Sequence, residues 1–145
     1  MPSDEHALFV KMTVSIMITT KNRLADLRRT CCALQQLDPR PLEILVTADG
    51  CTNDLVEAVQ ADLPEARLFV NRSALGSVAS RDRMMRAARG DLVLALDDDS
   101  YPEQLDCIGR IVPTFEQQIL APVATRCWEI GLAVDRKSRY EGGRS

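Results

Sequence analysis

The sequence is poor in several residue types on which common functions depend. Its single histidine, His6, cannot supply a Ser-His-Asp triad or a metal site built from several histidines. Aromatic residues make up only 4% of the 145 residues, and the net charge is −3, so neither a stacking platform nor a basic surface for nucleic acid is expected. No apolar run reaches the roughly 20 residues that span a bilayer, and residues 2–5 (PSDE) are acidic where a signal peptide is basic. We therefore expect a cytoplasmic protein with no transmembrane segment and no nucleic-acid partner.

The cysteines indicate neither a disulfide framework nor a zinc site. Their number is odd, their spacings match no zinc pattern, and adjacent cysteines do not favour a bridge with each other. They are Cys31, Cys32, Cys51, Cys107 and Cys127. We expect reduced thiols, most of them packed in the interior.

Short apolar segments alternate with segments of helical periodicity. Strands are expected at residues 12–18, 42–46, 67–70, 92–96 and 119–124, and the wholly apolar 92–96 is expected to be central. This alternation predicts an α/β fold, a three-layer sandwich around a mostly parallel sheet. Residues 1–11 are expected to form a leader, 12–134 the domain and 135–145 a flexible tail.

Four helices are expected between these strands. Asp54 and Ser77 are expected to cap the second and third helices, and Pro102 to be the first residue of the fourth. The expected inward side chains are Leu24, Leu27, Cys31, Leu34 and Leu37 in the first helix, Leu55, Val56, Val59 and Leu63 in the second, Val78, Met84, Met85 and Ala88 in the third, and Leu105, Ile108, Val112 and Phe115 in the fourth.

Three of the strands end abruptly in polar clusters. These clusters are residues 19–23 (TTKNR), 49–54 (DGCTND) and 97–100 (DDDS). Parallel strands present their carboxyl ends at one edge of the sheet, where open α/β folds bind ligands. We therefore expect the three clusters to meet in one site.

The three consecutive aspartates are the most informative of these residues. Two carboxylates about 5 Å apart repel by about 3 kcal/mol at an effective dielectric constant near 20, so Asp97, Asp98 and Asp99 are expected to need a cation among them. Mg²⁺ or Mn²⁺ would suit carboxylate ligands and would complete its shell with substrate phosphates. The alternative is that these aspartates only cap a helix and face solvent.

Taken together, the three clusters resemble a known family. The runs VSIMITTKNR, EILVTADGCTND and NRSALGSVASRDRMMRAARGDLVLALDDDSYP are similar to the nucleotide-binding half of family 2 inverting glycosyltransferases of the GT-A fold. The resemblance covers roughly residues 12–102, with the motifs in the family's order and spacing. Any one motif alone would be weak evidence.

The resemblance implies a role for each cluster. Thr19, Thr20, Asn22 and Arg23 would lie beside the nucleoside of a UDP-, dTDP- or GDP-linked sugar, and Asp49 would hold the base. The aspartate run occupies the family's DxD position: Asp97 would lie near the ribose and the metal, Asp98 would belong to the donor site, and Asp99 would bind the metal directly. Arg81 falls where the family places an arginine that assists the donor; alternatively, it lies on a solvated helix face.

The chain also departs from the family pattern. Ala48 stands where members often have a first acid, and Asp82 follows Arg81 where asparagine is common, which leaves the donor's identity open. Inverting transfer needs a general base, which the family carries well beyond the DxD. The later acids, Glu129, Asp135 and Glu141, form no such motif, so no catalytic residue is identified. We expect a truncated domain.

The sequence thus favours a metal-dependent glycosyltransferase acting on an unknown acceptor. The alternative is a truncated module that binds the nucleotide sugar without transferring it. Self-association through exposed apolar edges is expected in either case. A haloacid-dehalogenase-type phosphatase is disfavoured because its Asp-x-Asp follows the first strand. A nucleotidyltransferase is disfavoured because residues 19–22 contain no glycine.

Overall fold

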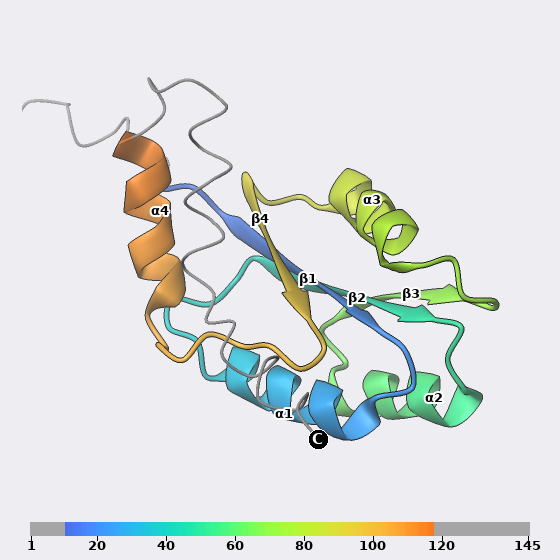
Figure 1. The fold of residues 1–145 in the computed structure, drawn as a ribbon. Coiled ribbons are helices and arrows are strands. Elements are labelled where there is room, and N and C mark those ends of the chain that lie inside the picture. Colours follow the sequence, from blue (N-terminus) through green and yellow to red (C-terminus); the bar gives the residue numbers. More distant parts are fainter. Residues whose placement is uncertain (1–10, 118–145) are drawn as a thin grey trace, which may run out of the picture.

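A computed structural model describes residues 11–117. Its elements alternate as the sequence predicts, and four parallel strands form one sheet in the order β3-β2-β1-β4 (Figure 1). The strands are β1 (Val14–Thr20), β2 (Glu43–Asp49), β3 (Arg67–Asn71) and β4 (Leu92–Asp97). The expected strand at 119–124, the tail at 135–145, almost all of the leader, and His6, Cys127, Glu129, Asp135 and Glu141 lie outside the described residues.

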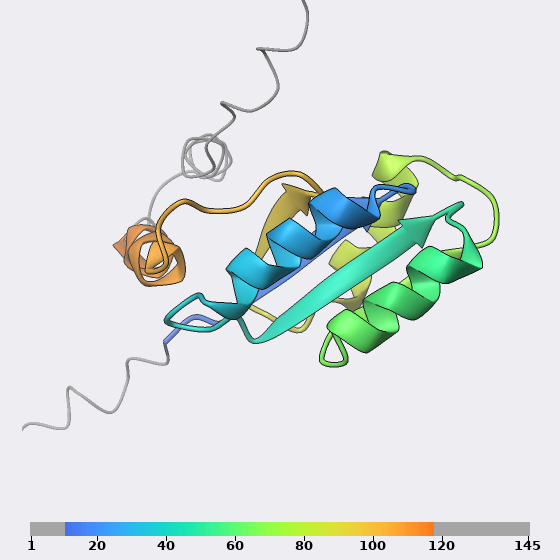
Figure 2. The same ribbon diagram turned by 90° about the horizontal axis from the view of Figure 1, so that it is seen from below.

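Helices cover both faces of this sheet, which confirms the predicted α/β sandwich. The helices are α1 (Leu24–Gln35), α2 (Asn53–Asp62), α3 (Ser77–Ala87) and α4 (Cys107–Gln117). In Figure 1, α1 and α2 lie below the strands and α3 above them, and Figure 2 shows α1 and α2 side by side along the lower face. Helix α4 stands beside α1 and β4 and contributes Ile108 and Val112 to the same core as α1 and α2.

The two faces of the sheet differ in the size of their cores. Alternate residues of β1, such as Ile16 and Ile18, join the large core under α1, α2 and α4, whereas Met17 joins a small core with Leu45 and Met84 under α3. The central strands β1 and β2 are thus largely buried on both faces.

The described part of the sheet places β4 differently from the prediction. Strand β4 pairs with β1 and forms one edge of the four strands, and Ala95 is exposed. The expected neighbour at 119–124 lies outside the described residues.

Several details of the helices differ from the sequence prediction. The cap of α2 is Thr52, whose hydroxyl accepts a hydrogen bond from Leu55 N, and Asp54 lies inside the first turn. The cap of α3 is Gly76, with φ of 94°, and α4 begins five residues after Pro102. The expected inward residues that prove exposed are Val78, Met85 and Leu105. Helix α3 packs on the sheet through a narrow stripe of buried residues, Ser80 and Met84. The helical spacing of apolar residues therefore predicted more buried positions on α3 than the structure has.

Glu43 organises the edge of the sheet opposite the polar clusters. Its carboxylate accepts hydrogen bonds from Ser15 Oγ (2.9 Å), Arg67 Nη1 (2.9 Å) and Arg89 N (2.6 Å). Burial raises the pKa of Glu43, but these hydrogen bonds outweigh it and hold the pKa below its ordinary value. The contacts tie β1, β2 and β3 to the connection between α3 and β4.

No helix among residues 11–117 is both long enough and apolar enough to cross a membrane.

The burial of α1 and the exposure of α3 can be tested with two substitutions. Leu27 is 1% exposed, so Leu27→Ala should lower the free energy of unfolding by about 2–5 kcal/mol. Val78 is 80% exposed, so Val78→Ala should change it by less than about 0.5 kcal/mol. Urea unfolding monitored by circular dichroism would measure both changes; a larger loss from Val78→Ala would mean that this residue is packed.

Candidate functional site: the carboxyl edge of the sheet

All four strands end in a polar residue at the same edge. These residues are Thr20, Asp49, Asn71 and Asp97, at the ends of β1, β2, β3 and β4 respectively. The parallel register places Asp97 opposite Thr19, and Asn71 opposite Asp49. The edge that the sequence predicted as a ligand site is therefore assembled, with Asn71 as a member that the sequence analysis did not identify.

Asp49 holds the loop that leads into α3. It is 3% exposed, and its carboxylate accepts hydrogen bonds from Asn71 Nδ2 (2.9 Å), Leu75 N (2.8 Å) and Gly76 N (2.9 Å). Burial raises the pKa of Asp49, but the three hydrogen bonds outweigh it and leave the pKa below its ordinary value. Asp49 is thus a buried, ionised anchor for this loop.

Gly50 allows the same loop to approach closely. It adopts a φ of 65°, and a Cβ at this position would lie 2.7 Å from Ala74 N. The Gly50 N–H donates to Asn71 O at 2.9 Å. A side chain at residue 50 would therefore push the loop away from Asp49.

Asn22 joins the loops that follow β1 and β2. Its backbone is left-handed, with φ of 53°, and its side-chain oxygen accepts a hydrogen bond from Thr52 N at 3.0 Å. Cys51 strengthens the same junction, because its thiol lies 3.3 Å from Thr20 O and 3.4 Å from Asn22 N. Asn22, expected beside the nucleoside, thus also holds the edge together.

The aspartates at the end of β4 point in different directions. Asp97 forms an ion pair with Arg81 of α3, with Nη2 2.8 Å from Oδ1. Asp98 is 4% exposed and lies on the α1 side of the sheet, where Thr20 Oγ1 at the end of β1 (3.0 Å) and Arg23 Nη1 just before α1 (3.1 Å) donate to its carboxylate. Asp99 lies 3.5 Å from Arg23 Nη2. Burial is the main cause of the raised pKa of Asp98, and the contacts with Thr20 and Arg23 offset it only in part.

Two arginines supply positive charge to the aspartate run, a source of charge that the expectation of a cation among the three carboxylates did not include. Strand alternation sends Asp97 and Asp98 to opposite faces, and the guanidinium groups of Arg23 and Arg81 supply positive charge to the run. Among residues 11–117, no three acidic, cysteine or histidine side chains gather as a metal site. The carboxylates of Asp97 and Asp99 still suit Mg²⁺ or Mn²⁺, which use one or two carboxylates and complete their shell with phosphates and water. Asp98 does not fit as a ligand, because its carboxylate is turned toward α1.

Three polar atoms on the α3 side of the sheet, the side of Asp97, lie buried with no hydrogen-bond partner among the described residues. They are the hydroxyl oxygens of Thr19 and Thr47 and the Nε of Arg81. Thr19 stands opposite both Thr47 and Asp97 in the register, so the two hydroxyls and the carboxylate form one row across the face covered by α3. This row belongs to the same edge site as Asp49.

The comparisons with known proteins agree with this geometry. The Glycosyl transferase family 2 profile matches residues 15–140 of the chain. The chain belongs to this family. A curated member, the uncharacterized glycosyltransferase YwdF of Bacillus subtilis (strain 168), is 30% identical over 106 residues, which are 71% of this chain. The chain spans 39% of the length of that relative.

Two solved structures show that the family 2 chain has the GT-A fold. The mannosyltransferase PcManGT from Pyrobaculum calidifontis, solved with GDP-Man and Mn²⁺, matches with a TM-score of 0.62 and 20% identity, over 72% of this chain and 32% of its own. TarS residues 1–349 from S. aureus, solved with UDP, matches with the same score and identity, over 74% of this chain and 33% of its own. At this identity the likeness establishes the fold.

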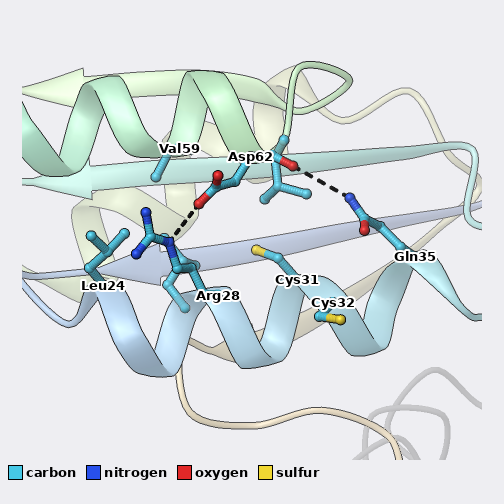
Figure 3. A pocket seen from close by; sticks show the side chains of 9 residues that line it. Leu24, Arg28, Cys31, Cys32, Gln35, Val59 and Asp62 are labelled. Carbon is cyan, nitrogen blue, oxygen red and sulfur yellow. Dashed lines mark hydrogen bonds and ion pairs between the residues drawn. The ribbon is translucent and has the colours of Figure 1, made fainter.

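A separate cavity of about 290 Å³ lies between α1 and α2 (Figure 3). Its walls include Leu24, Cys31 and Val59, and an ion pair between Arg28 Nε and Asp62 Oδ2 (2.7 Å) spans it. Burial raises the pKa of Cys31 to about 12, so this thiol is unreactive. The cavity contains none of the polar strand-end residues of the family 2 motifs.

The anchoring role of Asp49 can be tested by an isosteric substitution. Asp49→Asn would turn an N–H₂ group toward backbone N–H donors, so the free energy of unfolding at pH 7 should fall by about 1.5–3 kcal/mol. Glu57→Gln, at an exposed position on α2, is the control and should change it by less than about 0.5 kcal/mol.

The same pair of proteins tests the lowered pKa of Asp49. A lowered folded-state pKa contributes stability above the unfolded value of about 3.9 and loses it as the pH falls through the folded-state pKa. The difference between wild type and Asp49→Asn should therefore shrink as the pH falls below about 3.9. A difference that stays constant from pH 7 to pH 2 would contradict an ionised anchor.

Proposed function

We propose that this family 2 chain binds a nucleotide-diphosphate sugar at the carboxyl edge of its sheet, in the presence of Mg²⁺ or Mn²⁺. As part of a family 2 enzyme it transfers the sugar to an acceptor. The observation that carries the proposal is the convergence of Thr19, Asp49, Arg81 and the aspartate run on one edge of a GT-A fold. The complexes of PcManGT with GDP-Man and Mn²⁺, and of TarS with UDP, support this class of ligand.

The arginines of the edge would recognise the diphosphate. A guanidinium can donate two parallel hydrogen bonds to phosphate oxygens, and both Arg23 and Arg81 already lie at this edge. Arg23 is half exposed and Arg81 is 39% exposed, so both can reach a ligand without unfolding a helix. Arg81 could exchange Asp97, and Arg23 could exchange Asp99 while it keeps Asp98, for a phosphate oxygen, so each guanidinium would stay paired.

Asp97 and Asp99 would hold the divalent cation, which, when bound, supplies Lewis-acid stabilisation of the charge on the leaving diphosphate. Asp97 is already paired with Arg81, and Asp99 lies near Arg23, so each of these carboxylates would contact both an arginine and the cation.

Asp49 would take part in two ways. Its carboxylate orders the loop at residues 72–76, and it would accept a hydrogen bond from the base.

Calorimetric titration tests the binding part of this proposal. UDP and GDP are titrated into the chain with and without Mn²⁺, and the titrations are repeated on Asp99→Ala. We expect one nucleotide to bind in a metal-dependent way and Asp99→Ala to abolish that binding. Asp106→Ala is the matched control: Asp106 is an exposed acid paired with Arg110 outside the three motifs, and its loss should leave the affinity unchanged.

The outcomes separate the two functions that the sequence left open. Equal binding by wild type and Asp99→Ala would overturn the metal role. If the chain binds the nucleotide in a metal-dependent way, but incubation with the corresponding nucleotide sugar gives neither sugar release nor transfer to any acceptor offered, a binding module is favoured over a transferase.

A further inference from the structure

Thr30 is a polar residue on the buried, otherwise apolar face of helix α1. It is fully buried (0% exposed) on the face of α1 that also carries Leu27, Cys31 and Leu34. A helical threonine commonly satisfies its hydroxyl on a carbonyl of its own helix, one turn earlier. Here the hydroxyl instead donates to Asp98 O at 2.7 Å, across 68 residues of sequence. The bond therefore joins the middle of α1 to the aspartate run at the end of β4.

This bond completes a set of contacts that fixes Asp98 on α1. Thr20 Oγ1 donates to the carboxylate at 3.0 Å, Arg23 Nη1 donates to it at 3.1 Å, and Thr30 holds the carbonyl of the same residue. Side chain and backbone of Asp98 are thus both held by β1 and α1. A residue fixed at both groups has little freedom to rotate.

The fixed position of Asp98 also restricts its two neighbours in the sequence. Asp97 and Asp99 are attached to it through peptide bonds, and the turn is closed by Ser100 N donating to Asp97 O at 3.2 Å. A shift of the Asp98 carbonyl would therefore redirect both flanking carboxylates.

We propose that Thr30 is a positioning residue for the cation site: through its bond to the Asp98 carbonyl, it sets the relative placement of the Asp97 and Asp99 carboxylates. The inference rests on the proposed role of these two carboxylates in holding Mg²⁺ or Mn²⁺. Thr30 contacts neither ligand and acts through Asp98.

The test measures Mn²⁺ affinity directly, by the loss of the free Mn²⁺ electron paramagnetic resonance signal in the presence of UDP or GDP. Thr30→Val keeps the shape of the side chain and removes its donor, and we expect it to weaken Mn²⁺ binding about tenfold, as removal of outer-shell partners does at metal sites. Thr30→Ser retains the hydroxyl and should bind within about twofold of wild type. Thr114→Val is the control, because Thr114 Oγ1 also donates to a backbone carbonyl, at 3.1 Å, but from an exposed position on α4.

A purely structural role predicts a different pattern. In that case Thr30→Val would lower the melting temperature and leave the Mn²⁺ affinity of the folded fraction unchanged, which would overturn the proposal. If the valine variant does not fold, Thr30→Ala and Thr30→Ser replace it: both lose the methyl group and they differ only in the hydroxyl. Equal Mn²⁺ affinity of that pair would also overturn the proposal.

Asp99→Ala in the same assay separates the two levels of the argument. If Asp99→Ala binds Mn²⁺ as wild type does, the proposed metal role itself fails. If Asp99→Ala loses Mn²⁺ while Thr30→Val keeps it, only the positioning role of Thr30 fails.

Discussion

The alternation of side chains along β4 constrains the whole edge site. Asp97 is the last residue of the strand and pairs with Arg81 on the α3 side, so Asp98 turns toward α1 and the buried Thr20. Two neighbouring carboxylates are thereby separated by the sheet itself. The three aspartates therefore have different surroundings: Asp97 pairs with α3, Asp98 is held on the α1 side, and Asp99 lies beyond the end of the strand.

This division explains how so much negative charge is accommodated. Each face supplies its own guanidinium, Arg81 from α3 and Arg23 from the start of α1, and the buried Asp98 also receives a hydroxyl hydrogen bond. A buried carboxylate without such donors would be strongly destabilising. Internal pairing therefore offsets part of the cost of the aspartate run, and a divalent cation at Asp97 and Asp99 would add to this pairing.

The sequence predicted the architecture because the spacing of apolar residues along the chain indicates which residues are buried. The apolar runs before Thr19, Asp49 and Asp97 identified three strands and the edge where they end, and this edge is where the polar residues meet. What it could not predict was which face each edge side chain occupies, because a shift of one residue in the end of a strand reverses the assignment. Thr30 was missed for a related reason: its partner is a backbone carbonyl 68 residues away, and a carbonyl leaves no trace in the residue pattern.

The position of Asp49 would limit how the proposed donor site can distinguish one nucleotide base from another. An ionised carboxylate has about four lone-pair positions, and in this chain three are already directed at Asn71 and the loop N–H groups of Leu75 and Gly76. A base N–H would have to use the remaining position on a side chain that is 3% exposed. If Asp49 binds the base as proposed, that contact would depend on the order of the loop at residues 72–76. A base that displaced the loop would cost the protein the hydrogen bonds between Asp49 and the loop, in addition to the base's own bond to Asp49.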